Sequence, residues 1–258
     1  MTPTEPVHIS SRDNPLVKEL GRLSRESVAY RKFGRVWLEG DHLCRAALAR
    51  GWKPTIAVFS STFWPTAPTS WSQTADKIVV LADALFADVS GLESPAGMGF
   101  VMPLPVAGSM DPNAATVILD RVQDAGNVGS ILRSAGAFGF KQVLAIKGTA
   151  ALWSPKVLRA GMGTHFGLQL MEGLDEGALE ALQVPLLVTS SHQGYILGSR
   201  PLPMPCAWAM GHEGQGVSPT LMARAQVSVR IGQPGGEESL NVAAAAAICL
   251  HASSLTGA

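Results

Sequence analysis

Cysteine is scarce in this sequence of 258 residues, and so are long apolar runs and any excess of one charge. The three cysteines, Cys44, Cys206 and Cys249, lie far apart and form no Cys-x-x-Cys or Cys/His ligand spacing. This distribution disfavours disulfides and structural zinc, so we expect no metal site and a reducing, cytoplasmic environment. The longest apolar run, from Val242 to Leu250, is shorter than the roughly 20 residues that span a bilayer, and the N-terminus lacks an apolar signal core.

The total charge does not indicate a polyanionic partner, because Lys and Arg together number 20 and so do Asp and Glu. The charges are not evenly distributed, however. Between Arg12 and Arg35, seven basic residues stand against three acidic ones. Such a mildly basic stretch is a hint of nucleic-acid contacts, but the usual explanation for a charge run is a solvated face.

Residues 103–113 concentrate Pro, Gly, Ser, Asp and Asn, which is typical of a linker between domains. The segment before them predicts a small α/β domain whose first helix is opened by Asn14-Pro15. After them, short apolar strands that do not alternate in polarity are separated by helices. This pattern predicts a parallel sheet covered on both faces, with ligands in the loops beyond the carboxyl ends of its strands. The expected division is 1–105, a linker at 106–115, and 116–258.

Local patterns give the approximate bounds of the expected elements. In the second domain we expect strands at 117–120, 143–146, 186–189, 207–210 and 227–231, and helices at 130–138, at 176–182, from Ser218-Pro219 and from about Leu240. In the first domain we expect strands at 36–39 and 56–59, a helix at 41–50, and an irregular loop at 62–74.

The first of three informative loops, 120–129, runs directly into a predicted helix. It contains neither Gly-x-Gly-x-x-Gly nor a P-loop lysine, which disfavours a dinucleotide or triphosphate site. Asn127 can cap the helix in a tight turn, which is the simplest explanation of the loop. Arg133 lies one turn into the helix, where its guanidinium is either a surface group or a clamp for a phosphate or ribose oxygen.

The second loop, 210–218, places three glycines around a single carboxylate, Glu213. Glycines expose the backbone to a ligand, and the carboxylate can accept hydrogen bonds from a ribose or hold a cationic group. We expect His212 to be a bystander. A glycine-rich turn without a ligand would not need the carboxylate, so we favour a functional loop.

The third loop, 231–241, leads into an alanine-rich helix. Ser239 or its neighbour Glu238 is expected to cap that helix, with Asn241 in its first turn and directed toward the loop edge. Alone this is a weak signal, and its value comes from standing third in a set.

Together the three loops resemble the signature motifs of the SpoU (TrmH-like) family of RNA methyltransferases. The matching residues are Asp124 or Asp120, Asn127, Gly129 and Arg133 in the first motif, Gly211, Glu213, Gly214 and Gly216 in the second, and Ser239 through Val242 in the third. The sequence departs from the family pattern at Ala125, Gly161 and Gly232-Gln233, which bears on the shape of the adenine pocket.

The resemblance implies a parallel-sheet SPOUT methyltransferase domain with a C-terminal trefoil knot, preceded by a small L30e-like RNA-binding domain. It implies S-adenosylmethionine as cofactor, a ribose 2′-hydroxyl of RNA, ribosomal RNA above all, as the methyl acceptor, and a homodimer. The implied cofactor contacts are Thr189, Gly211, Ile231 and Leu240; the residues shaping the catalytic site are Asn127, Arg133, Glu213, Ser239 and Asn241; the RNA contacts are Arg12, Lys18, Arg22, Arg31 and Lys32.

Members of the family are said to use the arginine of the first motif, here Arg133, to activate the ribose hydroxyl. Because a guanidinium keeps its proton at neutral pH, we expect Arg133 instead to orient the ribose and to neutralise the adjacent phosphate or the developing alkoxide. Alternative functions are a tRNA ribose methyltransferase and a non-catalytic RNA-binding protein that retains the fold. A Rossmann-type nucleotide enzyme is disfavoured by the missing glycine fingerprint.

Overall fold

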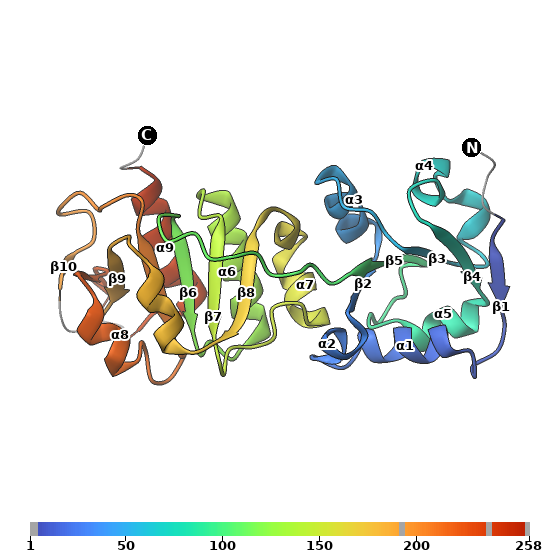
Figure 1. Cartoon of the computed structure of the whole chain (residues 1–258), viewed down its shortest axis with the longest axis horizontal. Coiled ribbons are helices and arrows are strands. Elements are labelled where there is room, and N and C mark those ends of the chain that lie inside the picture. The colour runs from blue at the N-terminus through green and yellow to red at the C-terminus, as the bar shows by residue number, and fades with distance from the viewer. Residues whose placement is uncertain (1–4, 191–193, 236–238, 256–258) are drawn as a thin grey trace. The chain divides into compact units, whose positions relative to one another are not determined.

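The computed structural model describes residues 5–190, 194–235 and 239–255, and Figure 1 shows its helices and strands. The chain divides into two compact units. The first comprises Met1–Val106 and Trp153–Phe166, and the second comprises Ala107–Leu152 and Gly167–Ala258. The division expected from the sequence is continuous along the chain, whereas the segment 153–166 joins the first unit.

The first unit is built on a five-stranded sheet in the order β1-β4-β3-β5-β2, in which β1, β4 and β3 are parallel and β5 is antiparallel to both β3 and β2. Its strands are β1 Val7–Ile9, β2 Arg35–Glu39, β3 Ile56–Ser60, β4 Lys77–Leu81 and β5 Met98–Pro103. Its helices are α1 Pro15–Leu23, α2 Ala29–Phe33, α3 Asp41–Ala49, η1 Trp64–Thr66, α4 Thr69–Ser72, α5 Asp83–Val89 and α7 Pro155–Gly161, and the short 3₁₀ helix η2 covers Thr164–Gly167.

Local signals placed the first helix correctly. Asn14 caps α1 as predicted, because its side-chain oxygen accepts a hydrogen bond of 2.9 Å from the backbone N–H of Leu16, and Pro15 occupies the first helical position. The predicted irregular loop at 62–74 instead contains the two short helices η1 and α4.

The second unit holds a seven-stranded sheet in the order β10-β12-β9-β11-β6-β7-β8, and each pair of neighbouring strands is parallel. The predicted parallel α/β fold is thereby confirmed. The strands are β6 Thr116–Asp120, β7 Gln142–Ile146, β8 Gln169–Leu174, β9 Leu186–Thr189, β10 Tyr195–Ile196, β11 Ala207–Gly211 and β12 Val227–Arg230. The helices are α6 Ala125–Ala137, the 3₁₀ helix η3 Glu176–Ala181, α8 Pro219–Arg224 and α9 Val242–Ser254.

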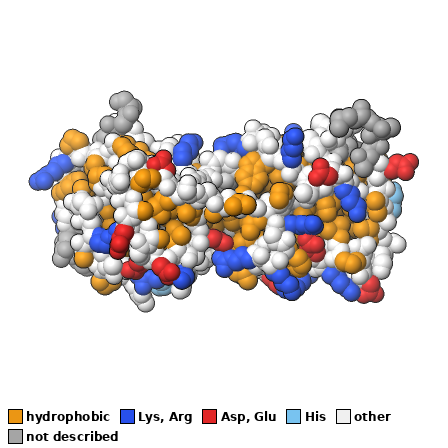
Figure 2. Space-filling view, viewed as in Figure 1, with side chains coloured by type: hydrophobic (Ala, Val, Ile, Leu, Met, Phe, Trp, Pro, Cys, Tyr) orange, Lys and Arg blue, Asp and Glu red, His pale blue; other side chains and the backbone are white. Residues whose placement is uncertain are grey.

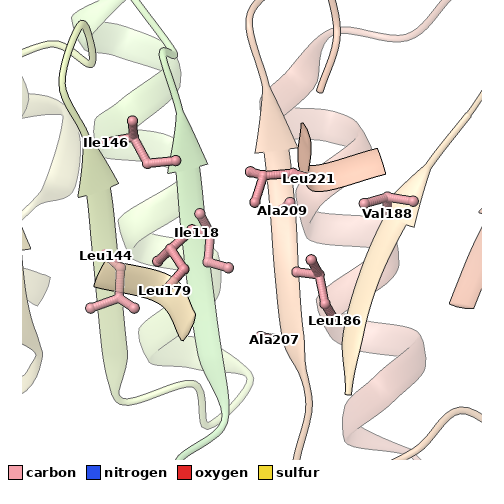
Figure 3. Packing of buried hydrophobic residues seen from close by; sticks show 9 residues of the cluster. All are labelled: Ile118, Leu144, Ile146, Leu179, Leu186, Val188, Ala207, Ala209 and Leu221. Carbon is pink, nitrogen blue, oxygen red and sulfur yellow. The ribbon is translucent and has the colours of Figure 1, made fainter. Parts of the chain in front are cut away.

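Apolar side chains at alternate strand positions build the core on one face of this sheet (Figure 3). They come from the four central strands and are closed over by Leu179 of η3 and Leu221 of α8. The strand residues of the cluster are Ile118, Leu144, Ile146, Leu186, Val188, Ala207 and Ala209. Helices α6 and α9 pack together, and α9 is tied to β11 by a buried hydrogen bond of 2.8 Å from Trp208 Nε1 to Ser253 Oγ. Burial on both faces explains why the strands are continuously apolar.

Two predictions for this unit were wrong in detail, and strand β8 was missed. The helix expected at 130–138 begins five residues earlier, at Ala125, because Asp124 caps it: its Oδ1 accepts a hydrogen bond of 2.8 Å from the N–H of Asn127. The helix expected at 176–182 is a 3₁₀ helix. Strand β8 was not predicted, because four of its six residues are only half-buried and one is exposed, so the segment lacks a clear apolar run.

The three cysteines are buried as free thiols. Burial raises the pKa of Cys206 to about 11 and that of Cys249 to about 12. Within residues 5–190, 194–235 and 239–255, no group of three or more His, Cys, Asp or Glu side chains is arranged to hold a metal ion. In the same residues, no helix has the length and apolar character that crossing a membrane requires.

Candidate functional site

A cavity lies at the carboxyl edge of the sheet in the second unit. Its volume is about 530 Å³, which is typical of a site for a small molecule. The ends of β9, β11 and β12 and the beginning of α9 converge on it, as expected for a ligand site in a parallel sheet. The lining residues are Thr189, Ser190, Gly211, His212, Glu213, Gly214, Gln215, Gly216, Val217, Ile231, Gln233, Ser239, Leu240, Asn241, Val242 and Ala245.

The loop after β11 folds back sharply on Gly211. The backbone of His212 both donates to and accepts from that of Gly216, at 3.0 and 2.8 Å. A Cβ on Gly211 would lie 2.2 Å from the carbonyl carbon of Gly216, so no larger residue fits without moving the backbone. The ring of His212, expected to be a bystander, accepts hydrogen bonds at Nδ1 from the N–H groups of Gly214 and Gln215, at 3.0 and 3.2 Å. His212 therefore shapes this loop.

The carboxylate of Glu213 receives three hydrogen bonds from the first loop. The N–H groups of Gln123 and Asp124 donate to it at 3.2 and 3.0 Å, and Asn127 Nδ2 donates at 3.0 Å. Burial would raise the pKa of Glu213, but these hydrogen bonds, with Asn127 the largest contributor, lower it to about 2. Glu213 is therefore a carboxylate anion at neutral pH, and it ties the second motif to the first.

The side chain of Asn127 also reaches the third motif. Its Oδ1 accepts a hydrogen bond of 3.0 Å from Asn241 Nδ2, while Oδ1 of Asn241 accepts hydrogen bonds from the N–H groups of Ala243 and Ala244 at 2.9 and 3.3 Å. Asn241 is thus the cap of α9. The prediction that Ser239 or Glu238 caps this helix is wrong for Ser239, and Glu238 lies outside the described residues. The three side chains Glu213, Asn127 and Asn241 form a continuous chain of hydrogen bonds, which we call the amide relay.

A fully buried carboxylate, that of Asp120, also holds these loops in place. Asp120, at the end of β6, accepts hydrogen bonds from the N–H of Ser218 at 2.6 Å and from Nε of Arg121 at 2.8 Å. Ser218 is the cap of α8, as the sequence predicted, so Asp120 fixes the end of the glycine-rich loop. Asp120 and Asp124, left as alternatives for one motif position, therefore have separate structural tasks, because Asp124 caps α6.

The structure brings most of the predicted site residues together. The four residues expected to contact the cofactor, Thr189, Gly211, Ile231 and Leu240, all line the cavity, as do Glu213, Ser239 and Asn241. Asn127 joins them through the amide relay. Sequence reasoning did not name the lining residues Gln215, Val217 and Ala245. Ala245 lies four residues after Asn241 and one turn along α9, so helical periodicity counted from Asn241 would have identified it.

Arg133 stands apart from this group. Its side chain is exposed on α6 and is not among the residues that line the cavity. Within the described part of the chain, Arg133 has neither an ion pair nor a side-chain hydrogen bond. Within a single chain, Arg133 therefore does not line the cavity with Glu213 and Asn241.

Carboxylates already pair with much of the basic stretch in the first unit. Arg12 pairs with Asp88 at 2.8 Å, Lys18 with Asp13 at 2.9 Å, and Arg22 with Glu26 at 2.8 Å. The other two predicted RNA contacts, Arg31 and Lys32, lie in α2 and are exposed, with the Arg31 guanidinium over the ring of Tyr30. Figure 2 likewise shows blue and red side chains interspersed on the visible face. Carboxylates therefore neutralise part of the positive charge of this stretch locally.

Comparison with known proteins gives one consistent result. The profile of the SpoU rRNA methylase family matches residues 114–251. The 23S rRNA (guanosine(2553)-2′-O)-methyltransferase RlmP of Bacillus subtilis is 30% identical over 94% of this chain and 97% of its own. The crystal structure of an RNA 2′-O ribose methyltransferase aligns with a TM-score of 0.79 at 27% identity, over 97% of this chain and 99% of that chain. The SpoU methyltransferase AviRb of Streptomyces viridochromogenes, solved with AdoMet, shares the fold with a TM-score of 0.80 at 20% identity, over 94% and 98% of the two chains.

Replacing Gly211 with alanine should destabilise the second unit, because the new Cβ would overlap the backbone of Gly216. Overpacking of this kind costs about 1–3 kcal/mol, measurable as a lower free energy of unfolding in urea. Gly214→Ala is the matched control: the nearest heavy atoms to its Cβ would lie 3.8 Å away, and the change should stay within about 0.5 kcal/mol. Equal effects of the two substitutions would contradict the account of the loop.

The lowered pKa of Glu213 predicts a specific pH dependence. A glutamate has a pKa of about 4.3 in an unfolded chain and about 2 here, so the carboxylate adds stability above pH 4.3 and loses that contribution as the pH falls toward 2. The difference in unfolding free energy between the wild type and Glu213→Ala should therefore be constant from pH 5 to 8 and shrink below about pH 4.3. Glu180→Ala, which removes an exposed carboxylate outside the site, controls for general charge effects. If the difference in unfolding free energy grew as the pH fell, the pKa of Glu213 would have to be raised in the folded protein, which would contradict this account.

Proposed function

This chain belongs to the SpoU rRNA methylase family, and we propose that it is an RNA methyltransferase that uses S-adenosylmethionine to methylate a ribose 2′-hydroxyl. The observation that supports the proposal most directly is the amide relay, because it draws the three family motifs together around one cavity. A protein that had kept only the fold would not need these polar side chains.

The cavity fits the proposed cofactor. Ile231, Leu240 and Val242 offer an apolar wall for an adenine, and Gly211 lines the same cavity. The Glu213 carboxylate gives the site a fixed negative charge that suits a cationic ligand. S-adenosylmethionine, when bound, supplies a methyl group on a positively charged sulfur.

The remaining tasks fall to the residues of the chain. The ribose 2′-oxygen has to be aligned and has to lose its proton, and alignment alone contributes much of the rate in such reactions. Asn127 and Glu213 satisfy each other's hydrogen-bonding groups, so they fix the shape of the site instead of accepting the proton. We assign to Arg133 the orientation of the ribose and the neutralisation of negative charge on the 2′-oxygen or its phosphate.

A second copy of the chain explains why Arg133 lies outside the cavity of its own subunit. Ile248 of α9 and Leu255, which directly follows the helix, are 41% and 65% exposed, and the first nine residues of α9, Val242 to Leu250, are all apolar, which is unusual for a helix that faces water. We infer a homodimer in which this side of α9 is covered and the Arg133 of one subunit serves the cavity of the other. Ser239 and Asn241, in contrast, serve the cavity of their own subunit, which they line.

The substrate we propose is ribosomal RNA, on the basis of the B. subtilis relative, whose name specifies 23S rRNA. A tRNA substrate is the alternative. We further propose that the first unit is an L30e-like RNA-binding domain, that the end of the second unit forms a trefoil knot, and that the protein acts in the cytoplasm. The last proposal is supported by three buried, unpaired cysteines.

Replacing Arg133 with alanine should reduce methyl transfer to RNA by roughly 100- to 1,000-fold, the cost of losing one group that stabilises developing charge. Binding of S-adenosylmethionine, measured by calorimetry, should be unchanged, because Arg133 does not line the cavity. Ser134→Ala is the control on the same helix: its hydroxyl donates to the carbonyl of Ser130 within α6, and its loss should leave the rate intact. A loss of cofactor binding in Arg133→Ala would mean that the arginine is structural.

The same variant tests the function in cells. Mapping 2′-O-methylation in total RNA with and without the gene should reveal one ribose site that disappears, and that site identifies the substrate. The wild-type gene should restore it and the Arg133→Ala gene should not. An unchanged ribose-methylation map would contradict the proposed function.

A further inference from the structure

Two ionisable side chains belong to the described wall of the cavity, those of Glu213 and His212. Hydrogen bonds lower the pKa of Glu213 to about 2, which makes its carboxylate a poor acceptor for the ribose proton. Histidine is the side chain that enzymes use most often as a general base. The state of the His212 ring therefore decides whether this wall can supply a base.

Both hydrogen bonds to the His212 ring reach the same nitrogen. The N–H groups of Gly214 and Gln215 donate to Nδ1 at 3.0 and 3.2 Å. A ring nitrogen that accepts hydrogen bonds carries no hydrogen, so a neutral ring bonded in this way has its hydrogen on Nε2. The imidazolium has hydrogens on both nitrogens and cannot accept these bonds. The conformation in the structure therefore belongs to the neutral ring with hydrogen on Nε2.

The second ring nitrogen, Nε2, then has a hydrogen to donate. Among residues 5–190, 194–235 and 239–255, none accepts a hydrogen bond from it. His212 is half-buried and lines the cavity. Because Nε2 already carries the hydrogen and Nδ1 is occupied by two N–H groups, the ring can donate to a ligand but has no free lone pair to receive a proton.

The same two hydrogen bonds order a glycine-rich turn. Glycine loses more conformational freedom on folding than any other residue, and Gly216 adopts a φ of 68°. A Cβ on Gly214 would lie 3.8 Å from both Cε1 and Nδ1 of His212, so the ring lies against the turn without crowding it. All residues from 211 to 217 line the cavity. A change in the conformation of this turn would therefore alter a large part of the wall.

We propose that His212 is a binding and positioning residue of the cofactor site. Its Nδ1 holds the turn in the conformation that binds S-adenosylmethionine, and its Nε2–H donates to an acceptor atom of the bound cofactor. The ring is not the base that takes the ribose proton. The inference rests on the proposed function and adds to it the role of a side chain in the second motif.

NMR spectroscopy tests the position of the hydrogen without any ligand. The full-length protein is labelled with ¹⁵N in its six histidines, and two-bond couplings to the ring C–H groups show which nitrogen carries a hydrogen. The ring signal that is absent from His212→Asn belongs to His212, and we expect it to report hydrogen on Nε2. Hydrogen on Nδ1, or a charged ring at neutral pH, would overturn the inference.

Two conservative variants separate the roles of the two nitrogens. In His212→Asn, Oδ1 can take the place of Nδ1 as acceptor for the turn, whereas in His212→Gln the amide extends toward the position of Nε2. Each neutral hydrogen bond contributes about 2- to 10-fold to affinity. His212→Asn loses only the bond from Nε2, so calorimetry should show S-adenosylmethionine binding weakened by about 2- to 10-fold.

His212→Ala loses all three hydrogen bonds and should weaken binding more than His212→Asn does, by more than about tenfold. His212→Gln should not recover this loss. If the alanine variant is too unstable to measure, the comparison of the asparagine and glutamine variants decides the question. Equal affinities of the asparagine variant and the alanine or glutamine variant would overturn the inference.

Turnover distinguishes a donor from a base. Removing a general base lowers the rate by about 10²- to 10⁴-fold. In His212→Asn, kcat at saturating cofactor and RNA should fall by no more than about tenfold, and its profile against pH should keep the shape of the wild-type profile. His8→Asn makes the same exchange at an exposed position of β1 and should change neither kcat nor cofactor affinity. A larger fall in kcat with the loss of one limb of the pH profile would make the ring the base.

The outcomes also distinguish this inference from the proposed function. If the wild type binds S-adenosylmethionine and methylates ribose while His212→Asn keeps the full cofactor affinity, Nε2 does not donate to the cofactor and the inference is overturned. A wild type that neither binds S-adenosylmethionine nor methylates RNA would refute the proposed function itself.

Discussion

The side chain of Asn127 is the one on which the candidate site depends. Its amide donates to Glu213 and accepts from Asn241, so that one residue connects loops that lie 86 and 114 positions away in the sequence. Both polar ends of the amide are used, and each partner is fixed in turn, Glu213 by the N–H groups of Gln123 and Asp124 and Asn241 by the first turn of α9. The wall of the cavity therefore forms as one unit.

Surrounding contacts make this relay rigid. Asp120 fixes the end of the glycine-rich loop through Ser218, and His212 fixes its middle. Hydrogen bonds hold Glu213 as an anion, which keeps a negative charge in the wall of the cavity. Arg133 lies outside this fixed centre, on an exposed position of α6.

Local rules in the sequence were sufficient for several elements of the fold. Asn14-Pro15 and Ser218-Pro219 marked helix starts, apolar runs marked the central strands, and the common edge of parallel strands placed the three loops together. Sequence patterns failed where contacts between residues far apart in the chain determine the local structure. Residues 125–129 contain two glycines, which favour a loop, yet they are helical because Asp124 and, from far along the chain, Glu213 satisfy polar groups at the start of α6. The exposed position of Arg133 likewise depends on packing that no local pattern encodes.

An exchange of donor and acceptor tests the relay most directly. Asn127→Asp places a carboxylate against Glu213, and Glu213→Gln places an amide where N–H groups require an acceptor, so each change alone should weaken S-adenosylmethionine binding. In the double variant the new amide can donate to the new carboxylate, so the losses should not add: calorimetry should show a favourable coupling of about 0.5–3 kcal/mol and an affinity above that of Asn127→Asp. Simple addition of the two losses would contradict the relay.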